Sequence, residues 1–188
     1  FMASKMLSGG FNPEKLKVLC NFVDPEKLQR LQSAEVNHRE SYYCYVGRLS
    51  EEKGVCTLLE AASKVKHELR IAGGGPLTDE LKAKYAHCPN IKFLGHLDAN
   101  AVASLLSQAK CSVLPSEWYE NNPLSVIESL CAGTPVVGAN IGGIPELISA
   151  DTGIIFESGN AEALATGIDM AMSRTWLHPD IKAESISR

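Results

Sequence analysis

The stretch "CSVLPSEWYENNPLSVIESLCAGTPVVG", residues 111–138, contains a complete strand–helix–strand unit. Its ends, Cys111–Leu114 and Pro135–Gly138, are continuously apolar, as is typical of strands buried on both faces of a parallel sheet. The helix predicted between them, residues 123–132, starts with a proline and is followed by a glycine, which suits its two ends. We expect Asn121 or Asn122 to cap it. Parallel strands joined by a helix are the repeating unit of α/β domains.

The same alternation continues on both sides of this unit. The other predicted strands are Tyr42–Val46, Leu69–Ala72, Ile91–Leu94 and Gly153–Phe156, and the other predicted helices are 54–66, 77–86, 98–108 and 160–172. Strands and helices of this length that alternate predict a doubly wound, Rossmann-like α/β domain with a parallel sheet over residues 41–172.

The two ends of the chain do not follow this alternation. Pro25–Glu40 is polar and resembles a linker, and in the polar segment 173–188 Pro179 interrupts a continuing helix. We therefore expect residues 1–40 to be the remnant of an upstream domain with an interdomain linker. Residues 173–188 are expected to form a loose C-terminal tail.

The composition excludes several classes of protein. The chain has 188 residues, 45% of them hydrophobic, and a net charge of −4, which fits a globular domain and argues against nucleic-acid binding. No apolar run has the roughly 18–20 residues of a membrane-spanning helix, and the start shows no signal-peptide pattern. The six cysteines form no C-x-x-C pair or zinc-site spacing, so we predict that they pack as small core residues in a reduced, cytoplasmic protein.

Three loops between a predicted strand and a predicted helix carry candidate chemistry, because ligands of such folds bind at the carboxyl ends of the strands. In "VGRLSEEKGV", residues 46–55, Gly47 allows a turn, and Arg48 and Lys53 place two cations beside a helix start, where a pair of phosphates can bind. The lysine precedes its glycine, so this is no Walker loop. Taken alone, either Arg48 or Lys53 is more simply interpreted as a solvated surface cation.

The second loop, "IAGGGPLTDEL", residues 71–81, partly imitates the dinucleotide fingerprint. The third glycine is missing, and no acidic residue ends the next predicted strand. A plain tight turn fits this loop equally well.

The third loop leads into the helix predicted at 123–132. Glu120 precedes that helix, Glu128 lies at the edge of its apolar face, and Leu124 is expected to face the core. Carboxylates accept hydrogen bonds from hydroxyls, and sugars present many hydroxyls. A capping acid and a solvated helix acid remain the alternatives for each glutamate alone.

Four segments in order resemble the C-terminal domain of a family 4 retaining glycosyltransferase of the GT-B fold. They are "VGRLSEEKG", "IAGGGP", "IKFLGHL" and "LPSEWYENNPLSVIESLCAGTPVVGANIGGIPELI". The last contains the family's E-x7-E spacing, Glu120 to Glu128, and its A-G-x-P-V-V turn. "VLCNFVDPEKL", residues 18–28, resembles the family's interdomain segment. The fold implied is the C-terminal half of a GT-B enzyme.

The resemblance implies a role for each site residue. Glu120 would hold hydroxyls of the donor sugar, Glu128 the ribose hydroxyls, and Arg48 and Lys53 the diphosphate, so that Glu120, Arg48 and Lys53 are the expected catalytic residues. The base would rest against the loop at 93–97. The residues expected to contact the donor are Gly47, Arg48, Lys53, Leu94, Glu120, Asn122, Leu124, Ser125 and Glu128. Many members have glycine where this chain has Asn122 and Pro123, so a contact made elsewhere by the amide at position 123 is absent here.

The implied reaction transfers a sugar from a nucleotide diphosphate sugar to an acceptor hydroxyl with retention, in the synthesis of a polysaccharide, lipopolysaccharide or glycolipid. The nucleotide sugar is the expected partner, with no metal, cofactor or nucleic acid. A missing N-terminal domain would bind the acceptor, so the chain alone is expected to be inactive; peripheral membrane association of the full-length protein is left open. The alternatives are a nucleotide-sugar epimerase of similar architecture and a non-catalytic nucleotide-sugar-binding module.

Overall fold

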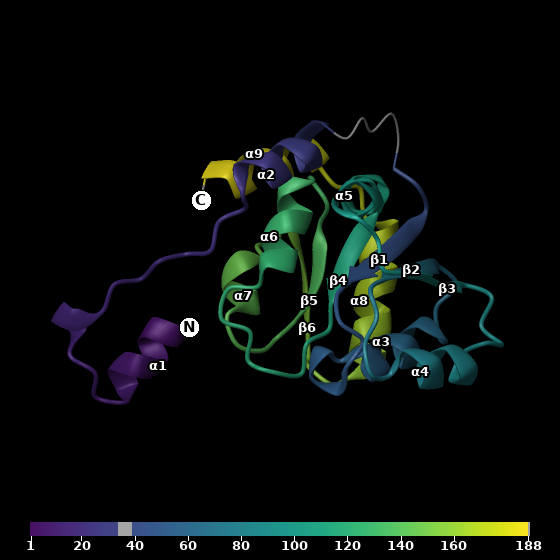
Figure 1. Ribbon diagram of the computed structural model, residues 1–188, viewed down its shortest axis with the longest axis horizontal. Helices are drawn as coiled ribbons and strands as arrows, with labels where there is room; N and C mark the ends of the chain where they lie inside the picture. The colour runs from purple at the N-terminus through teal and green to yellow at the C-terminus, as the bar shows by residue number, and fades with distance from the viewer. Residues whose placement is uncertain (34–38, 188) are drawn as a thin grey trace.

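A computed structural model describes residues 1–33 and 39–187 and contains one parallel sheet (Figure 1). Its strands are β1 (Tyr42–Val46), β2 (Glu68–Ala72), β3 (Ile91–Gly95), β4 (Cys111–Leu114), β5 (Val136–Ala139) and β6 (Gly153–Phe156). The strands lie in the order β3-β2-β1-β4-β5-β6. The doubly wound sheet predicted from the sequence is therefore confirmed.

Helices cover both faces of this sheet (Figure 1). The five predicted helices are present as α3 (Val55–Ala62), α4 (Thr78–Lys84), α5 (Ala99–Gln108), α6 (Leu124–Cys131) and α8 (Ala161–Ser173), and a short helix not predicted, α7 (Ile144–Leu147), follows β5. Side chains of β1 alternate between the faces. Tyr43 and Tyr45 pack with α3, α4 and α8, whereas Tyr42 and Cys44 pack with α5 and a helix from the N-terminal region. This explains why the strand reads as continuously apolar.

That N-terminal helix, α2 (Pro25–Ser33), shows that the linker interpretation of this stretch was wrong. Its Leu31 is buried in the cluster formed with α5 and the end of α6. Proline suits the first turn of a helix, so Pro25 begins the helix where the polar composition suggested a linker. The part of the predicted linker at 34–38 lies outside the described residues, and the assignment of residues 1–40 to an upstream domain stays a prediction.

The C-terminal segment likewise forms a helix, α9 (His178–Ser187), and is not a loose tail. Helix α8 already ends at Ser173, before Pro179, so this proline does not interrupt it; Pro179 stands in the first turn of α9, where its missing N–H is not needed. Trp176 and Ile181 are buried in the main core and fix the segment to the body of the domain.

The first residues stand apart from the sheet (Figure 1). They comprise α1 (Met2–Ser8), a 3-10 turn at Pro13–Lys15 and an extended segment, residues 16–24, that leads to α2. No helix in the described ranges 1–33 and 39–187 is long and apolar enough to cross a bilayer.

The cysteines are free, and only some of them are core residues. Cys44, Cys111 and Cys131 are buried as predicted, and Cys88 is half-buried. Cys20 and Cys56 are exposed, because one lies on the extended segment and the other on the outer side of α3. For these two the core prediction was wrong.

Candidate functional site

The strand order creates a crevice between the carboxyl ends of β1 and β4. The chain winds from β1 towards β3 on one side and from β4 towards β6 on the other, and such switch points are where ligands bind in open α/β sheets. Two loops border the crevice, residues 47–54 after β1 and residues 115–123 after β4. Both were singled out from the sequence.

These two loops are in direct backbone contact. The N–H of Glu117 donates to the carbonyl of Glu52 at 3.1 Å. Gly54 has φ of +66°, and a Cβ there would lie 1.8 Å from the carbonyl oxygen of Pro115. Only glycine fits this position, which holds the end of the first loop against the start of the second.

Lys53 and Glu120 join the loops at the crevice. The Lys53 Nζ lies 2.6 Å from Glu120 Oε1, and the Ser116 hydroxyl donates to the same oxygen at 2.9 Å. The two charged side chains are 34% and 20% exposed, so a ligand can reach both. An ammonium has further donors and a carboxylate further acceptor positions, so the pair can bind a ligand while intact.

A third loop, after β5, fixes the backbone at Glu120. The Gly143 N–H donates to the Glu120 carbonyl at 2.6 Å. A Cβ on Gly142 would lie 2.3 Å from that carbonyl oxygen, and one on Gly143 would lie 1.9 Å from the carbonyl oxygen of Asn121. No role was predicted for these glycines, although two adjacent glycines in the loop after a predicted strand were a usable signal.

The start of α6 differs from the prediction in three ways. Pro123 is the N-cap, one residue before the helix, and no side chain caps it. Asn122 does not cap the helix, and its buried Oδ1 has no hydrogen-bond partner among the described residues. Leu124 is 45% exposed and so does not face the core, because it is the first residue of α6 and lies at the open end of the helix. The first N–H groups of α6, at Leu124 and Ser125, are thus not used by a capping side chain.

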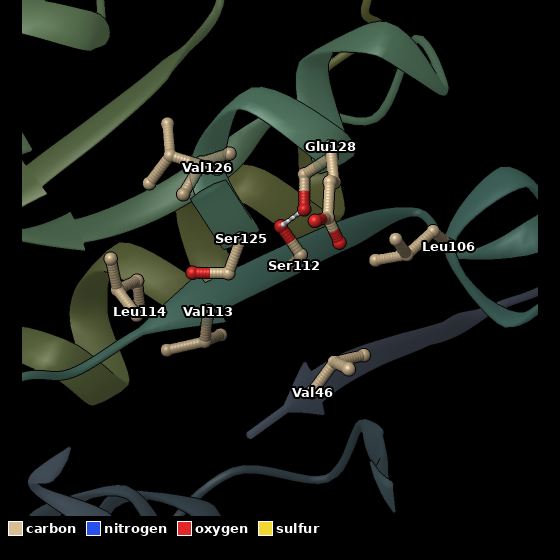
Figure 2. A pocket seen from close by; sticks show the side chains of 10 residues that line it. Val46, Leu106, Ser112, Val113, Leu114, Ser125, Val126 and Glu128 are labelled. Atoms are coloured by element: carbon tan, nitrogen blue, oxygen red, sulfur yellow. Dashed lines mark hydrogen bonds between the residues drawn. The ribbon is translucent and has the colours of Figure 1, made fainter. Parts of the chain in front are cut away.

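Glu128 lies in the second turn of α6 on the side turned to β4 (Figure 2). It is 8% exposed, which confirms the predicted sheltered position. Ser125 lies on the same side, and both residues line a small cavity with Ser112 of β4 and Val46 of β1.

A lysine that the sequence analysis missed reaches Glu128. The Nζ of Lys27, on α2, lies 2.6 Å from Glu128 Oε1. Because the segment at 25–40 was interpreted as a linker, no contact with α6 was expected. The apolar spacing of Leu28 and Leu31 was the signal that α2 packs against the domain.

The remaining predicted residues lie at the same edge of the sheet, but the described part of the chain shows no hydrogen bond or ion pair between them and the side chains of Lys53 and Glu120. The side chain of Arg48 is exposed, with no ion pair in the described part of the chain, and its carbonyl accepts from the Tyr45 hydroxyl at 2.7 Å. Gly47 directly follows β1, and its N–H donates to the Ala72 carbonyl at 3.0 Å. Leu94 is 41% exposed on β3, two strands from β1.

The glycine-rich turn after β2 packs against the first loop. A Cβ on Gly73 would lie 2.0 Å from the Gly47 carbonyl oxygen, and one on Gly75 would lie 2.3 Å from that of Leu49. The Leu49 N–H donates to the Gly74 carbonyl at 3.1 Å. These glycines therefore permit close packing of two loops, which favours the tight-turn interpretation over a dinucleotide site.

Local electrostatics keep the first loop charged. The Ser50 hydroxyl donates to Glu52 Oε1 at 2.6 Å, and this hydrogen bond, aided by Arg48 and Lys53, lowers the pKa of Glu52. Burial raises the pKa of Tyr45, with further contributions from Glu120 and Glu52, so its hydroxyl stays neutral. Within the described residues, no three His, Cys, Asp or Glu side chains come together as metal ligands.

Comparison with known proteins places this geometry in a family. Residues 27–187 match the family model described as "Glycosyl transferases group 1". An uncharacterised glycosyltransferase of Methanocaldococcus jannaschii is 31% identical over 178 residues, which are 85% of this chain and 45% of that protein.

Two solved structures show the same fold. The lipopolysaccharide outer core galactosyltransferase WaaB in its apo form has a TM-score of 0.82 at 18% identity, over 100% of this chain and 55% of that one. Anabaena HepE in complex with UDP has a TM-score of 0.80 at 20% identity, over 99% of this chain and 57% of that one. The chain thus spans about half the length of these proteins.

Proposed function

We propose that this chain, which belongs to the glycosyl transferases group 1 family, binds the nucleotide sugar donor of a retaining glycosyltransferase. Its fold is that of the C-terminal domain of a GT-B glycosyltransferase. The observation that carries the proposal is the Lys53–Glu120 ion pair at the crevice between β1 and β4, next to the uncapped start of α6.

In this proposal the first loop binds the diphosphate. Lys53 uses one donor for Glu120 and directs the others to phosphate oxygens, and the exposed guanidinium of Arg48 supplies a planar set of donors. The N–H groups of Leu124 and Ser125 add the positive end of the α6 dipole. These groups take the negative charge of the diphosphate, and the binding is proposed to need no metal.

The two acids divide the sugars of the donor between them. Glu120, on the loop, accepts hydrogen bonds from the transferred sugar, and Glu128, sheltered on α6, accepts them from the ribose. The base lies towards Leu94, which offers apolar surface, and Gly47 lets the chain turn beneath the phosphates. The HepE structure contains UDP, which makes UDP the first nucleotide to test.

The proposed reaction follows from where charge develops. When the bond between the anomeric carbon and the phosphate oxygen breaks, its electrons stay on the diphosphate, and fixed cations and dipoles stabilise that leaving group. The acceptor oxygen forms the new bond on the face that the diphosphate leaves, which retains the anomeric configuration. The acceptor's proton passes to the departing phosphate oxygen.

The rest of the active site is proposed to lie outside this chain. An N-terminal domain of the same protein would bind the acceptor, so this chain alone binds the donor without efficient transfer. WaaB acts on the lipopolysaccharide outer core, and a related role in polysaccharide or lipopolysaccharide synthesis at the cytoplasmic side is proposed here.

The full-length protein provides the test. It is incubated with a panel of nucleotide sugars and an extracted glycan or glycolipid acceptor, and the released nucleoside diphosphate is measured. NMR of the product then gives the anomeric configuration. Release with a retained configuration supports the proposal, whereas an inverted product, or isomerisation of the sugar while it stays on the nucleotide, contradicts it.

A further inference from the structure

The contact between Lys27 and Glu128 joins two parts of the chain that are 101 residues apart. The Glu128 side chain is 11% exposed and that of Lys27 is 40% exposed, so the acid is nearly enclosed while the lysine reaches it from the rim. An enclosed carboxylate is unfavourable unless a cation or hydrogen-bond donors compensate its charge. Lys27 supplies the only ion pair that the described residues give Glu128.

The pair leaves the acid available for a ligand. Lys27 contacts Oε1 at 2.6 Å, and the described part of the chain shows no partner for the other oxygen. A carboxylate has more acceptor positions than one ammonium can occupy. Two neighbouring hydroxyls of a ribose can therefore bind Glu128 while Lys27 remains in place.

The segment that carries Lys27 is held firmly. The carboxylate of Asp24 accepts from the N–H groups of Glu26 and Lys27 at 3.0 and 3.3 Å and so caps the start of α2. Leu31 anchors the helix in the core beside α5. Just before the helix, the Asn21 amide donates to the carbonyl of Asn122 at 2.5 Å, at the start of α6. The segment thus contacts the first turns of α6 at two places.

We propose that Lys27 is a positioning residue of the donor site: it holds the Glu128 carboxylate in place, with one oxygen directed at the ribose hydroxyls of the nucleotide. The inference rests on the proposed ribose contact of Glu128. It extends the donor site to α2, a helix outside the crevice between β1 and β4. A group that is held in place before the ligand arrives loses less freedom on binding, so Lys27 raises affinity without touching the ligand.

The test compares UDP with 2′,3′-dideoxyuridine diphosphate by calorimetric titration of this chain. Lys27→Met should weaken UDP binding by roughly tenfold or more, because it leaves Glu128 enclosed and unpaired. The dideoxy analogue lacks the hydroxyls and should bind the variant and the wild type equally. Lys27→Arg should restore most of the affinity for UDP. Arg30→Met, which removes an exposed ion pair from the same helix, serves as the control and should change neither ligand.

Two further variants keep the outcomes apart. In a Glu128→Gln background, Lys27→Met should have no additional effect on UDP binding. Because this double variant lacks both charges of the pair, it can still be tested if Lys27→Met alone folds poorly. Equal losses for both ligands in Lys27→Met, or tighter binding of UDP, would overturn the inference; the latter would show that Lys27 competes with ribose. If Glu128→Gln selectively weakens UDP but Lys27→Met does not, only this inference fails. If Glu128→Gln does not discriminate between the ligands, the proposed ribose contact itself fails.

Discussion

Lys53 and Glu120 are 67 residues apart in the sequence, yet their charged groups lie 2.6 Å apart. The sequence predicted each residue from its own loop, but not the ion pair. The pairing depends on β1 and β4 being neighbours in the sheet, and strand order is not written in either loop. The pair also keeps both side chains oriented before a donor arrives, which is how a charged site avoids rearrangement on binding.

Removing either cation should weaken binding of the diphosphate selectively. For Arg48→Ala and for Lys53→Ala we expect a loss of roughly 1.5–3 kcal/mol for UDP, because each removes a charge-assisted contact, and little change for uridine. Lys53→Ala should lose more, since it also leaves Glu120 unpaired beside the phosphates. Calorimetric titration with both ligands measures this, and Lys82→Ala, an exposed lysine on α4, controls for net charge. Equal losses for UDP and uridine would refute the diphosphate assignment.

The two acids should separate nucleotide binding from sugar binding. Glu128→Gln should weaken UDP and the nucleotide sugar alike, because ribose is common to them. Glu120→Gln should leave UDP binding unchanged or slightly tighter, since it removes a charge that competes for Lys53, while it lowers turnover of the nucleotide sugar. Titration and initial rates of the full-length protein check this. If both substitutions changed only the binding of free UDP, the roles proposed for Glu120 and Glu128 would be wrong.

Among the elements, the strands were the easiest to predict and the terminal helices the hardest. The strands are short, mostly apolar runs next to polar, proline or glycine residues, so their bounds agree with the prediction to within one residue. The helices α2 and α9 are polar, and each has a proline in its first turn. In a sequence this proline looks like a break, whereas buried Leu31 and Ile181 show that each helix packs against the domain.

The start of α9 makes stability depend on pH. The ring of His178 donates from Nδ1 to the Gly133 carbonyl at 2.9 Å. Burial, with smaller contributions from Arg39 and Lys110, lowers the pKa of His178 from 6.5 to about 4. Between about pH 6.5 and pH 4, His178 is therefore protonated in the unfolded chain but still neutral in the folded chain. Its contribution to the unfolding free energy is complete above about pH 6.5 and is lost as the pH falls towards 4.

Replacement of the ring should remove that dependence. Between pH 7 and pH 5 the wild type should lose about 1–2 kcal/mol of unfolding free energy through His178. His178→Asn can keep a donor to the carbonyl but does not titrate, so its loss over the same range should be smaller by that amount. Urea unfolding of both proteins at the two pH values gives the difference. Identical losses for the two proteins would mean that the pKa of His178 is the same in the folded and the unfolded chain, which would contradict the prediction.

In the whole molecule, the parallel sheet and the GT-B glycosyltransferase domain predicted from the sequence are confirmed by the structure and the comparisons, whereas the roles of the loop residues stay predictions. It did not predict contacts between the N-terminal segment and α6, such as Lys27 with Glu128 and Asn21 with Asn122. These contacts join residues 101 apart. The apolar spacing in α2 indicates that this helix packs on the domain, but nothing in either segment indicates which residues of the other it contacts. The predicted donor site is therefore larger than the loops that suggested it.

The claim that this one domain carries the donor-nucleotide site is tested most directly by calorimetric titration of the chain with UDP, GDP and ADP, each with and without EDTA. We expect saturable binding of at least one nucleoside diphosphate, much weaker binding of the matching nucleoside, and no effect of EDTA. Because the proposed N-terminal domain would position the acceptor, the same sample should show little glycosyl transfer. Absence of binding for all three diphosphates, or binding that disappears with EDTA, would contradict the account.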